Sequence, residues 1–171
     1  MKKIEINGKY QQHKINKAND PNNYNIISKR DCMQKIPSFS NYDEKIMLNK
    51  LYLDQEFEYK KNMLQEITKK VNSYKTQDIN KNKYKEDNIN IEETIEKLVE
   101  SKLKCFYCSS EMKIFYKNVR EMDQWTLDRI DNNTNHNSNN IVVACLKCNL
   151  QRRRQDKNKF LLSKQLKIIK E

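Results

Sequence analysis

The chain has 171 residues, of which 36% are hydrophobic and 33% are charged, with one glycine and two prolines. This length supports one domain, or a small domain with an appendage, and this polarity excludes an enzyme with a large core and a deep apolar pocket. The 34 lysines and arginines exceed the 23 aspartates and glutamates and give a formal net charge of +11. Such a surface attracts nucleic acid, although scattered lysines that only keep the protein soluble are the alternative.

The N-terminal segment, residues 1–40, is predicted to be an irregular arm, because it is rich in Asn and Lys without sustained periodicity. It lacks the apolar run of a secretory signal, and no stretch of the chain approaches the length of a membrane span. We therefore expect a soluble, intracellular protein without a membrane partner, in the cytoplasm or nucleus, and in a host cell if the protein is viral. Cys32 is interpreted as an ordinary thiol.

Residues 41–75 are predicted to form one long amphipathic helix with Ser40 or Asn41 as its N-cap. Its apolar stripe consists of Ile46, Leu53, Phe57, Leu64, Ile67, Val71 and Tyr74. This 42–74 stripe could pack on the following domain or pair with a second copy in a homodimer, and the sequence does not choose between them. Residues 76–90 show no buried face and are interpreted as a linker.

Residues 91–171 are predicted to form a small α+β domain. Its predicted elements, in chain order, are a helix at 91–102, strands at 112–116, 124–130 and 141–144, and helices after Cys148 and at 159–170. The Asn-rich segment 131–140 connects the last two strands as a hairpin loop. The expected order around this loop is therefore strand, hairpin, helix.

Two Cys-x-x-Cys knuckles lie in this domain, formed by Cys105 and Cys108 and by Cys145 and Cys148. Two such pairs of thiols suit one tetrahedral zinc, because each knuckle turns two sulfurs toward one centre. The pairs lie farther apart than in a compact zinc ribbon. A zinc here would thus clamp together the ends of a small inserted fold.

The residues around the second knuckle carry a resemblance to a known family. Asp128 ends a predicted strand, Asn140 precedes the returning strand, and Asn149 directly follows the second knuckle. This arrangement resembles the ββα-metal nucleases of the HNH superfamily, in particular the endonuclease VII-like branch, which also carries a four-cysteine zinc. The longer pattern is similar to HNH-type proteins encoded by phages and large DNA viruses. It consists of Gln124 to Asn132, His136, Asn140 and the run from Cys145 to Arg153. The resemblance covers about residues 92–170 and implies a metal-dependent DNA endonuclease.

Asp128 and the side-chain carbonyl of Asn149 are the candidate ligands for Mg²⁺ or Mn²⁺. Hard divalent ions prefer oxygen, and Mg²⁺ commonly takes only one or two ligands from protein, which leaves positions for water and phosphate. Such an ion would stabilise the charge that develops during strand cleavage. The plainer interpretations are a solvated carboxylate at a strand end for Asp128 and a helix N-cap for Asn149.

The resemblance fails at the residue after Asp128, where the family commonly has a His that deprotonates water. Here the residue is Arg129, which stays protonated and cannot act as a base. We predict that Asp131, which stands where endonuclease VII-like proteins carry another active-site His, relays the proton instead. His136, the only His of this domain, is the other candidate base, and a structural or exposed position is its alternative. Arg129 is then predicted to donate to the scissile phosphate.

The remaining residues divide between binding and structure. Arg152, Arg153 and Arg154, on the predicted helix that begins at the site, are expected to contact DNA phosphates, with a solvated basic face as the alternative. Asn140 is expected to tie the hairpin loop together through backbone hydrogen bonds. Trp125 and Tyr107 are expected to pack in the core.

The sequence therefore favours an HNH-type DNA endonuclease with an α+β fold. A catalytically inactive zinc domain that binds nucleic acid is the first alternative. A zinc-stabilised interaction module that uses the long helix is a second, which leaves Asp128, Asn149 and the basic helix without a role.

Overall fold

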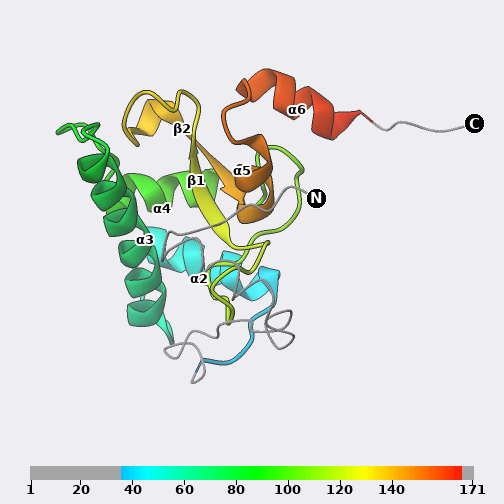
Figure 1. Ribbon diagram of the computed structural model, residues 1–171. Coiled ribbons are helices and arrows are strands. Elements are labelled where there is room, and N and C mark those ends of the chain that lie inside the picture. Colours follow the sequence, from blue (N-terminus) through cyan, green and yellow to red (C-terminus); the bar gives the residue numbers. More distant parts are fainter. Residues whose placement is uncertain (1–35, 167–171) are drawn as a thin grey trace, which may run out of the picture.

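The computed structural model describes residues 36–166 (Figure 1). Of the predicted N-terminal arm, only residues 36–40 are described. Cys32 lies outside the described residues. Eight elements follow one another: α2 (Asn41–Tyr52), α3 (Lys60–Asn80), α4 (Ile91–Glu100), β1 (Trp125–Arg129), the short 3-10 helix η3 (Ser138–Asn140), β2 (Ile141–Cys145), α5 (Leu146–Arg152) and α6 (Lys157–Gln165). Helices with a small two-stranded sheet confirm the predicted α+β class.

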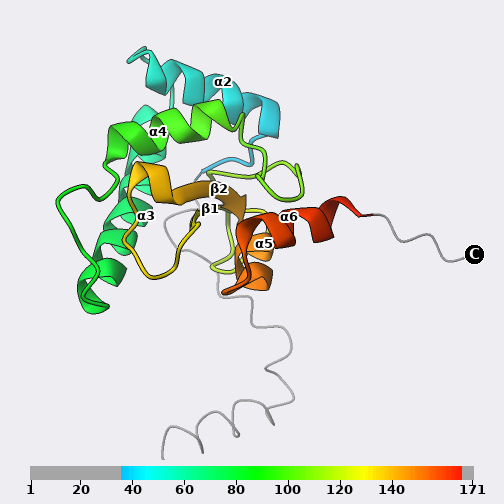
Figure 2. The ribbon, with the colours of Figure 1, turned by 90° about the horizontal axis from the view of Figure 1, so that it is seen from above.

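Helices α2, α3 and α4 pack on one another. In Figure 2, α2 and α4 lie on one side of the sheet and α3 stands beside it. Two of them begin with a capping box, in which Ser40 pairs with Asp43 at α2 and Asn90 pairs with Glu93 at α4. The predicted N-cap at Ser40 and the predicted helix from Ile91 are confirmed.

The predicted single helix over residues 41–75 is wrong. The chain leaves the helix after Tyr52 and enters α3 at Lys60, with Asp54 and Tyr59 at positive φ between them. A right-handed helix cannot continue through a left-handed residue, so the chain turns here. The break lets both halves of the segment pack on α4.

The apolar stripe on which a homodimer was predicted is divided by this break. Ile67 and Val71 are buried in the core, whereas Ile46, Leu53 and Leu64 are exposed. The stripe is therefore not one continuous face. A homodimer through the 42–74 segment stays a prediction, because the structure describes a single chain.

The segment 76–90 is not the unpacked linker that its composition indicates. Residues 76–80 complete α3, and Asp78 and Ile89 are buried. The Ile89 N–H donates to the His136 carbonyl at 2.7 Å, and Asn88 bridges to Asn137. Hydrogen bonds, rather than an apolar face, hold this segment against the hairpin loop.

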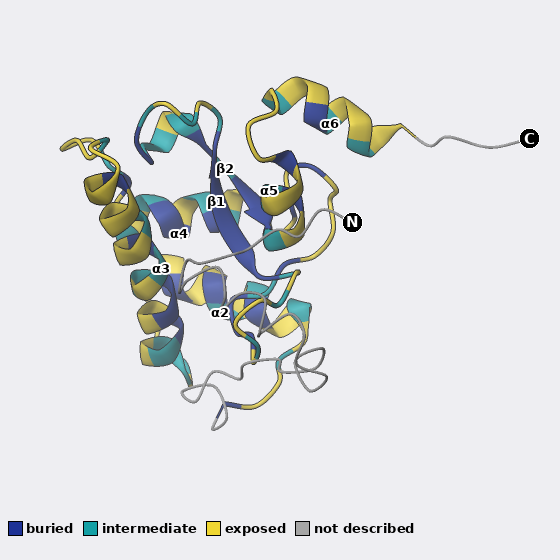
Figure 3. Ribbon diagram, in the orientation of Figure 1, coloured by how far each residue is buried: buried dark blue, intermediate teal, exposed yellow. Residues whose placement is uncertain are grey.

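Strands β1 and β2 pair antiparallel, from Trp125 opposite Cys145 to Arg129 opposite Ile141. They confirm the predicted strands at 124–130 and 141–144 and the hairpin connection between them. β1 is buried along its whole length (Figure 3).

The predicted strand at 112–116 is wrong. The segment makes only a single bridge, between Lys113 and Gln124. Its apolar side chains are buried, but the Ile114 N–H donates to the carboxylate of Glu44 in α2 at 2.5 Å instead of to a neighbouring strand. Burial raises the pKa of Glu44 to about 7. A side chain from α2 thus takes the place of a third strand.

Helix α5 follows β2 without a loop and packs on both strands, so a hairpin and a helix form one unit. Helix α6 lies beyond α5, where the Phe160 ring meets the Tyr107 ring edge to face at 4.9 Å. The closing helix, predicted over 159–170, begins two residues earlier, at Lys157. Ile168 and Ile169, which were predicted to belong to it, lie outside the described residues. No described helix combines the length and the apolar character that a bilayer span requires.

Candidate metal centre and adjoining hollow

The four knuckle cysteines lie together. The sulfurs of Cys105, Cys108, Cys145 and Cys148 are all within 4.8 Å of one another, and those of Cys108 and Cys145 are 3.9 Å apart. Four sulfurs bound at about 2.3 Å to one tetrahedral zinc would lie ~3.8 Å apart. The cluster could therefore hold a metal such as zinc.

This cluster sits where strand becomes helix. Cys145 ends β2 and caps α5, where its Sγ accepts a hydrogen bond from the Cys148 N–H at 3.4 Å. The hydrogen bond that the Cys105 thiol donates to Cys145, together with burial, raises the pKa of Cys105 to about 12. Burial raises the pKa of Cys148 to about 12. Thiolate ligands need a nearby cation to form in such surroundings. A metal here would fix the start of α5 against the sheet.

Asp128, in β1, is buried against α5 and the first knuckle. Arg152 donates to it twice, from Nε to Oδ2 at 2.5 Å and from Nη2 to Oδ1 at 2.8 Å, and the Tyr107 hydroxyl donates to Oδ2 at 2.7 Å. An ionised carboxylate has about four lone-pair sites. These three bonds leave one site, on Oδ1.

Arg152 does not belong to a basic surface, which corrects the predicted DNA contact. Its side chain is 1% exposed, and besides Asp128 it donates to the carbonyls of Gln155 and Arg129. The prediction failed because α5 turns this side chain toward the strand. Tyr107 and Trp125 are buried as predicted, and Tyr107 adds a polar contact to its packing.

The side-chain carbonyl oxygen of Asn149 is available to bind a ligand, because the amide nitrogen is the atom that bonds to Thr126. The Thr126 hydroxyl donates to the Ala144 carbonyl at 2.8 Å, so it must accept the 3.0 Å bond from Asn149 Nδ2. This fixes the orientation of the amide. Asn149 Oδ1 is then left without a hydrogen-bond partner among the described residues, and the side chain is half-buried.

Asp128 and Asn149 line the same open hollow, of about 480 Å³, which we call the central hollow. His136 also lines it, and α3 supplies the opposite wall through Lys70, Ser73, Tyr74 and Gln77. A water molecule occupies about 30 Å³ of liquid. The hollow has room for an ion with several waters and for a phosphate group.

Helix α3 covers the open edge of β1. Three of its side chains, each four residues apart, reach the strand: Lys70 donates to the Trp125 carbonyl, the Tyr74 hydroxyl accepts from the Leu127 N–H at 3.0 Å, and Asp78 binds Arg129. Residues at this spacing share one face of a helix. Lys70 and Tyr74 satisfy backbone groups of β1 that a further strand would otherwise pair, whereas Asp78 binds the Arg129 side chain.

Arg129 is 9% exposed and is held by Asp78 at 3.3 Å and by the Thr134 carbonyl at 3.1 Å. These contacts hold the guanidinium between α3 and the hairpin loop. Arg129 also lines the central hollow, and its contact with a phosphate stays a prediction. His136 is 3% exposed and its Nδ1 lies 2.8 Å from Asp78 Oδ2. The buried position of His136 excludes the exposed alternative.

Asp131 does not line the central hollow. It is exposed in the hairpin loop, where its Oδ1 accepts from the Asn133 N–H at 2.8 Å. Asn140 holds this loop as predicted, because its side chain accepts from the Asp131 N–H and donates to the Asp131 and Asn135 carbonyls. The structure therefore brings Asp128, Asn149 and His136 together and leaves Asp131 outside.

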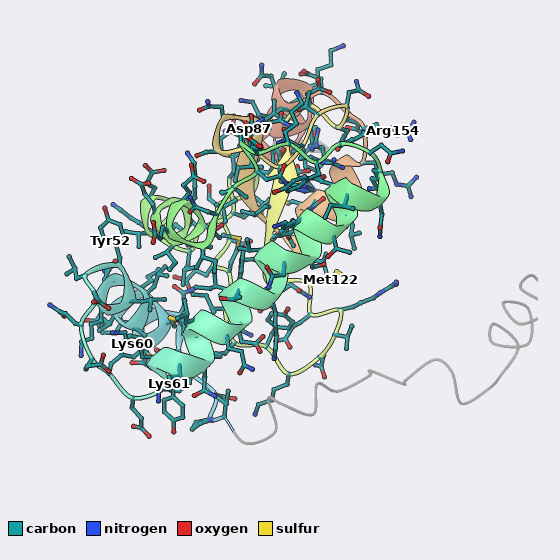
Figure 4. The ribbon with its side chains drawn as sticks, turned by 90° about the vertical axis from the view of Figure 1, so that its left-hand side faces the viewer. Tyr52, Lys60, Lys61, Asp87, Met122 and Arg154 are labelled. Atoms are coloured by element: carbon teal, nitrogen blue, oxygen red, sulfur yellow. The ribbon has the colours of Figure 1, made fainter. Side chains whose placement is uncertain are left out.

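A second hollow adjoins the first, and we call it the basic hollow. It contains Arg153 and Arg154, both exposed, together with Asp131 and Asp156, and it shares Lys81, Arg129 and Asn132 with the central hollow. Figure 4 shows Arg154 beyond the C-terminal end of α3. Two of the three predicted arginines thus lie next to the central hollow.

The sequence did not point to Asp78 or Thr126, although each positions a residue that it did select. A signal existed for Asp78, since Lys70, Tyr74 and Asp78 stand at helical spacing. Neither a protein family, a curated protein nor a solved structure shows a significant match to the chain.

We predict that the purified chain contains one zinc and that Cys105→Ser loses both the metal and the fold of residues 91–166. Structural zinc contributes on the order of 10 to 16 kcal/mol of apparent binding free energy at neutral pH, which a small domain cannot replace. Elemental analysis and thermal unfolding measure the two effects.

The matched control is Cys32→Ser, which removes the one cysteine outside the knuckles and should change neither zinc content nor the unfolding midpoint. A parent protein without metal, or a Cys105→Ser variant that melts with the parent, contradicts the prediction.

Proposed function

We propose that the protein is a metal-dependent DNA endonuclease of HNH type that hydrolyses phosphodiester bonds. The observation that supports this most is that Asp128, at the end of β1, and Asn149, in the helix that follows β2, line one open hollow beside the cysteine cluster. A strand hairpin and a helix, joined at a metal centre, carry these two oxygen donors. This is the arrangement that the resemblance to ββα-metal nucleases implies.

The donors fit a divalent ion such as Mg²⁺ or Mn²⁺. Asp128 Oδ1 keeps one free lone pair. The Asn149 amide is oriented so that Asn149 Oδ1 has no hydrogen-bond partner among the described residues, and both oxygens can bind an ion. Two protein oxygens leave coordination positions for water and phosphate. When bound, the ion would stabilise negative charge on the transferring phosphoryl group and the leaving oxygen.

The surrounding residues hold these donors in place. Arg152 and Tyr107 fix the plane of the Asp128 carboxylate, and Thr126 fixes the Asn149 amide. Zinc in the cysteine cluster would hold the start of α5, and with it Asn149, against β1. Preorganised ligands of this kind need little rearrangement when substrate binds.

The basic hollow is the proposed contact for the DNA backbone. Arg153, Arg154 and Lys81 surround it, and it adjoins the central hollow through shared residues. A strand whose phosphate is held here would continue directly past Asp128 and Asn149. Phosphate contacts of this kind set the register of the strand without reading its sequence.

A second candidate function is a catalytically inactive domain that binds nucleic acid. The observation that favours it is the occupation of Asp128 by Arg152, together with Arg129 in the place of the family's catalytic His. Cleavage of plasmid DNA by the parent protein in Mg²⁺ or Mn²⁺ decides between the two.

We predict that Asn149→Ala abolishes cleavage while DNA affinity changes little. The variant removes one of two proposed metal ligands, and thus an interaction that stabilises the transition state rather than the bound substrate. Plasmid cleavage and fluorescence anisotropy with a labelled duplex measure the two quantities. Asn149→Asp, which keeps an oxygen ligand, should retain part of the activity.

Asp128→Ala is a less suitable test, because it would leave Arg152 buried without its partner, at a cost of about 3 to 5 kcal/mol in folding free energy. The half-buried Asn149 avoids this problem. An Asn149→Ala variant that cuts at the parent rate would contradict the proposed role of Asn149 as a metal ligand.

We predict that replacing Arg153 and Arg154 by Ala weakens DNA binding and flattens its salt dependence by roughly 2 in the log-log slope, since each phosphate contact contributes about 0.9. The matched control replaces Lys50 and Lys61 by Ala, two exposed lysines that line neither hollow, and should leave the slope near that of the parent. Titrations at several salt concentrations give the slopes. Equal slopes in the parent and the double variant would mean that the two arginines are only a solvated face.

A further inference from the structure

Asp78, in the last turns of α3, is the hydrogen-bond acceptor for the hairpin loop. Its side chain is fully buried, and its Oδ2 accepts from Asn88 Nδ2 at 2.9 Å, from the His136 N–H at 2.8 Å and from the His136 ring at 2.8 Å. Burial alone would raise the pKa of Asp78, but the hydrogen bonds from His136 and Asn88 lower it below its usual value. Asp78 is therefore an ionised acceptor.

This acceptor determines which nitrogen of His136 carries the proton. An ionised carboxylate can only accept, so Nδ1 must be the donor of the 2.8 Å bond. Burial lowers the pKa of the imidazole, Asp78 opposes that shift, and Arg129 and Lys81 add to it. The neutral ring then carries its free lone pair on Nε2.

Nε2 is the ring nitrogen that Asp78 does not bind. It has no hydrogen-bond partner among the described residues, and the side chain is 4% exposed. His136 lines the central hollow together with Asp128 and Asn149. The Tyr74 ring, 4.7 Å from the imidazole, holds the plane of the ring from α3.

We propose that His136 Nε2 is the general base of the nuclease and that Asp78 is its positioning residue. This inference rests on the proposed function. It replaces the prediction that the base is Asp131, which lies in the neighbouring hollow. Helix α3, outside the segment that resembles the nuclease family, then supplies part of the catalytic machinery.

The step balances within the site. His136 Nε2 takes a proton from water, the water oxygen forms a bond to phosphorus, and the bond from phosphorus to the leaving oxygen breaks with its electron pair on that oxygen. The imidazolium that results is stabilised by the Asp78 carboxylate through the existing Nδ1 bond. Lys81 and Arg129 oppose this charge, which favours return of the proton to the leaving group or solvent.

The His136→Asn variant separates a catalytic from a structural role. The Asn amide nitrogen takes the place of Nδ1 and keeps the bond to Asp78, but nothing replaces Nε2. We expect a loss of 10² to 10⁴ in cleavage rate, the usual contribution of a general base, with the unfolding midpoint and DNA affinity near those of the parent. Added imidazole should restore part of the rate in a His136→Gly variant.

The two possible failures are distinguishable. If the parent cuts DNA and His136→Asn cuts equally fast, the base assignment is overturned and the proposed nuclease stands. If the parent does not cut in any divalent ion, both are overturned.

Long-range proton–nitrogen spectra test the geometry without any activity. The chain has two histidines, so His13→Gln leaves His136 as the only signal. We expect a neutral ring protonated at Nδ1. A ring protonated at Nε2 would contradict the proposal whatever the enzyme does.

Discussion

The buried carboxylate of Asp128 is the contact on which the site depends. Arg152 from α5 and Tyr107 from the first knuckle meet on it, so one side chain of β1 joins the strand to the helix and to the cysteine cluster. Such a pair is costly to bury unless its remaining polar groups are satisfied, and Arg152 meets this condition through the Gln155 and Arg129 carbonyls. In the proposed function, the same geometry holds Oδ1 toward the ion.

Asp78 likewise joins separate elements, on the other side of the hairpin. It binds Arg129 from β1 and His136 from the loop, so α3 fixes both the edge of the sheet and the histidine that lines the central hollow. The helical layer is thus more than an appendage to the hairpin and α5. Lys70 and Tyr74 bond to backbone groups at the edge of β1, and Asp78, one turn farther along α3, positions the proposed base.

Features that depend on local spacing could be predicted from the sequence. The α+β class, the hairpin, the cap at Ser40, the cysteine cluster and the loop contacts of Asn140 all follow short-range patterns. The break between α2 and α3 could not be predicted, because periodicity reports the faces of a helix and not its continuity. Arg152 shows a missed signal: it stands three residues after Asn149, on the same helical face, so a site at Asn149 implied that Arg152 points there too.

The central claim is that Asp128 and Asn149 hold a catalytic ion in the hollow that His136 lines. Anomalous diffraction at the manganese edge, from crystals of the zinc-loaded chain with bound DNA and Mn²⁺, tests it most directly. We predict a manganese peak within coordination distance of Asp128 Oδ1 and Asn149 Oδ1, separate from the cysteine cluster. Well-ordered DNA in the basic hollow with no manganese at these two oxygens would contradict the claim and favour the inactive, DNA-binding domain.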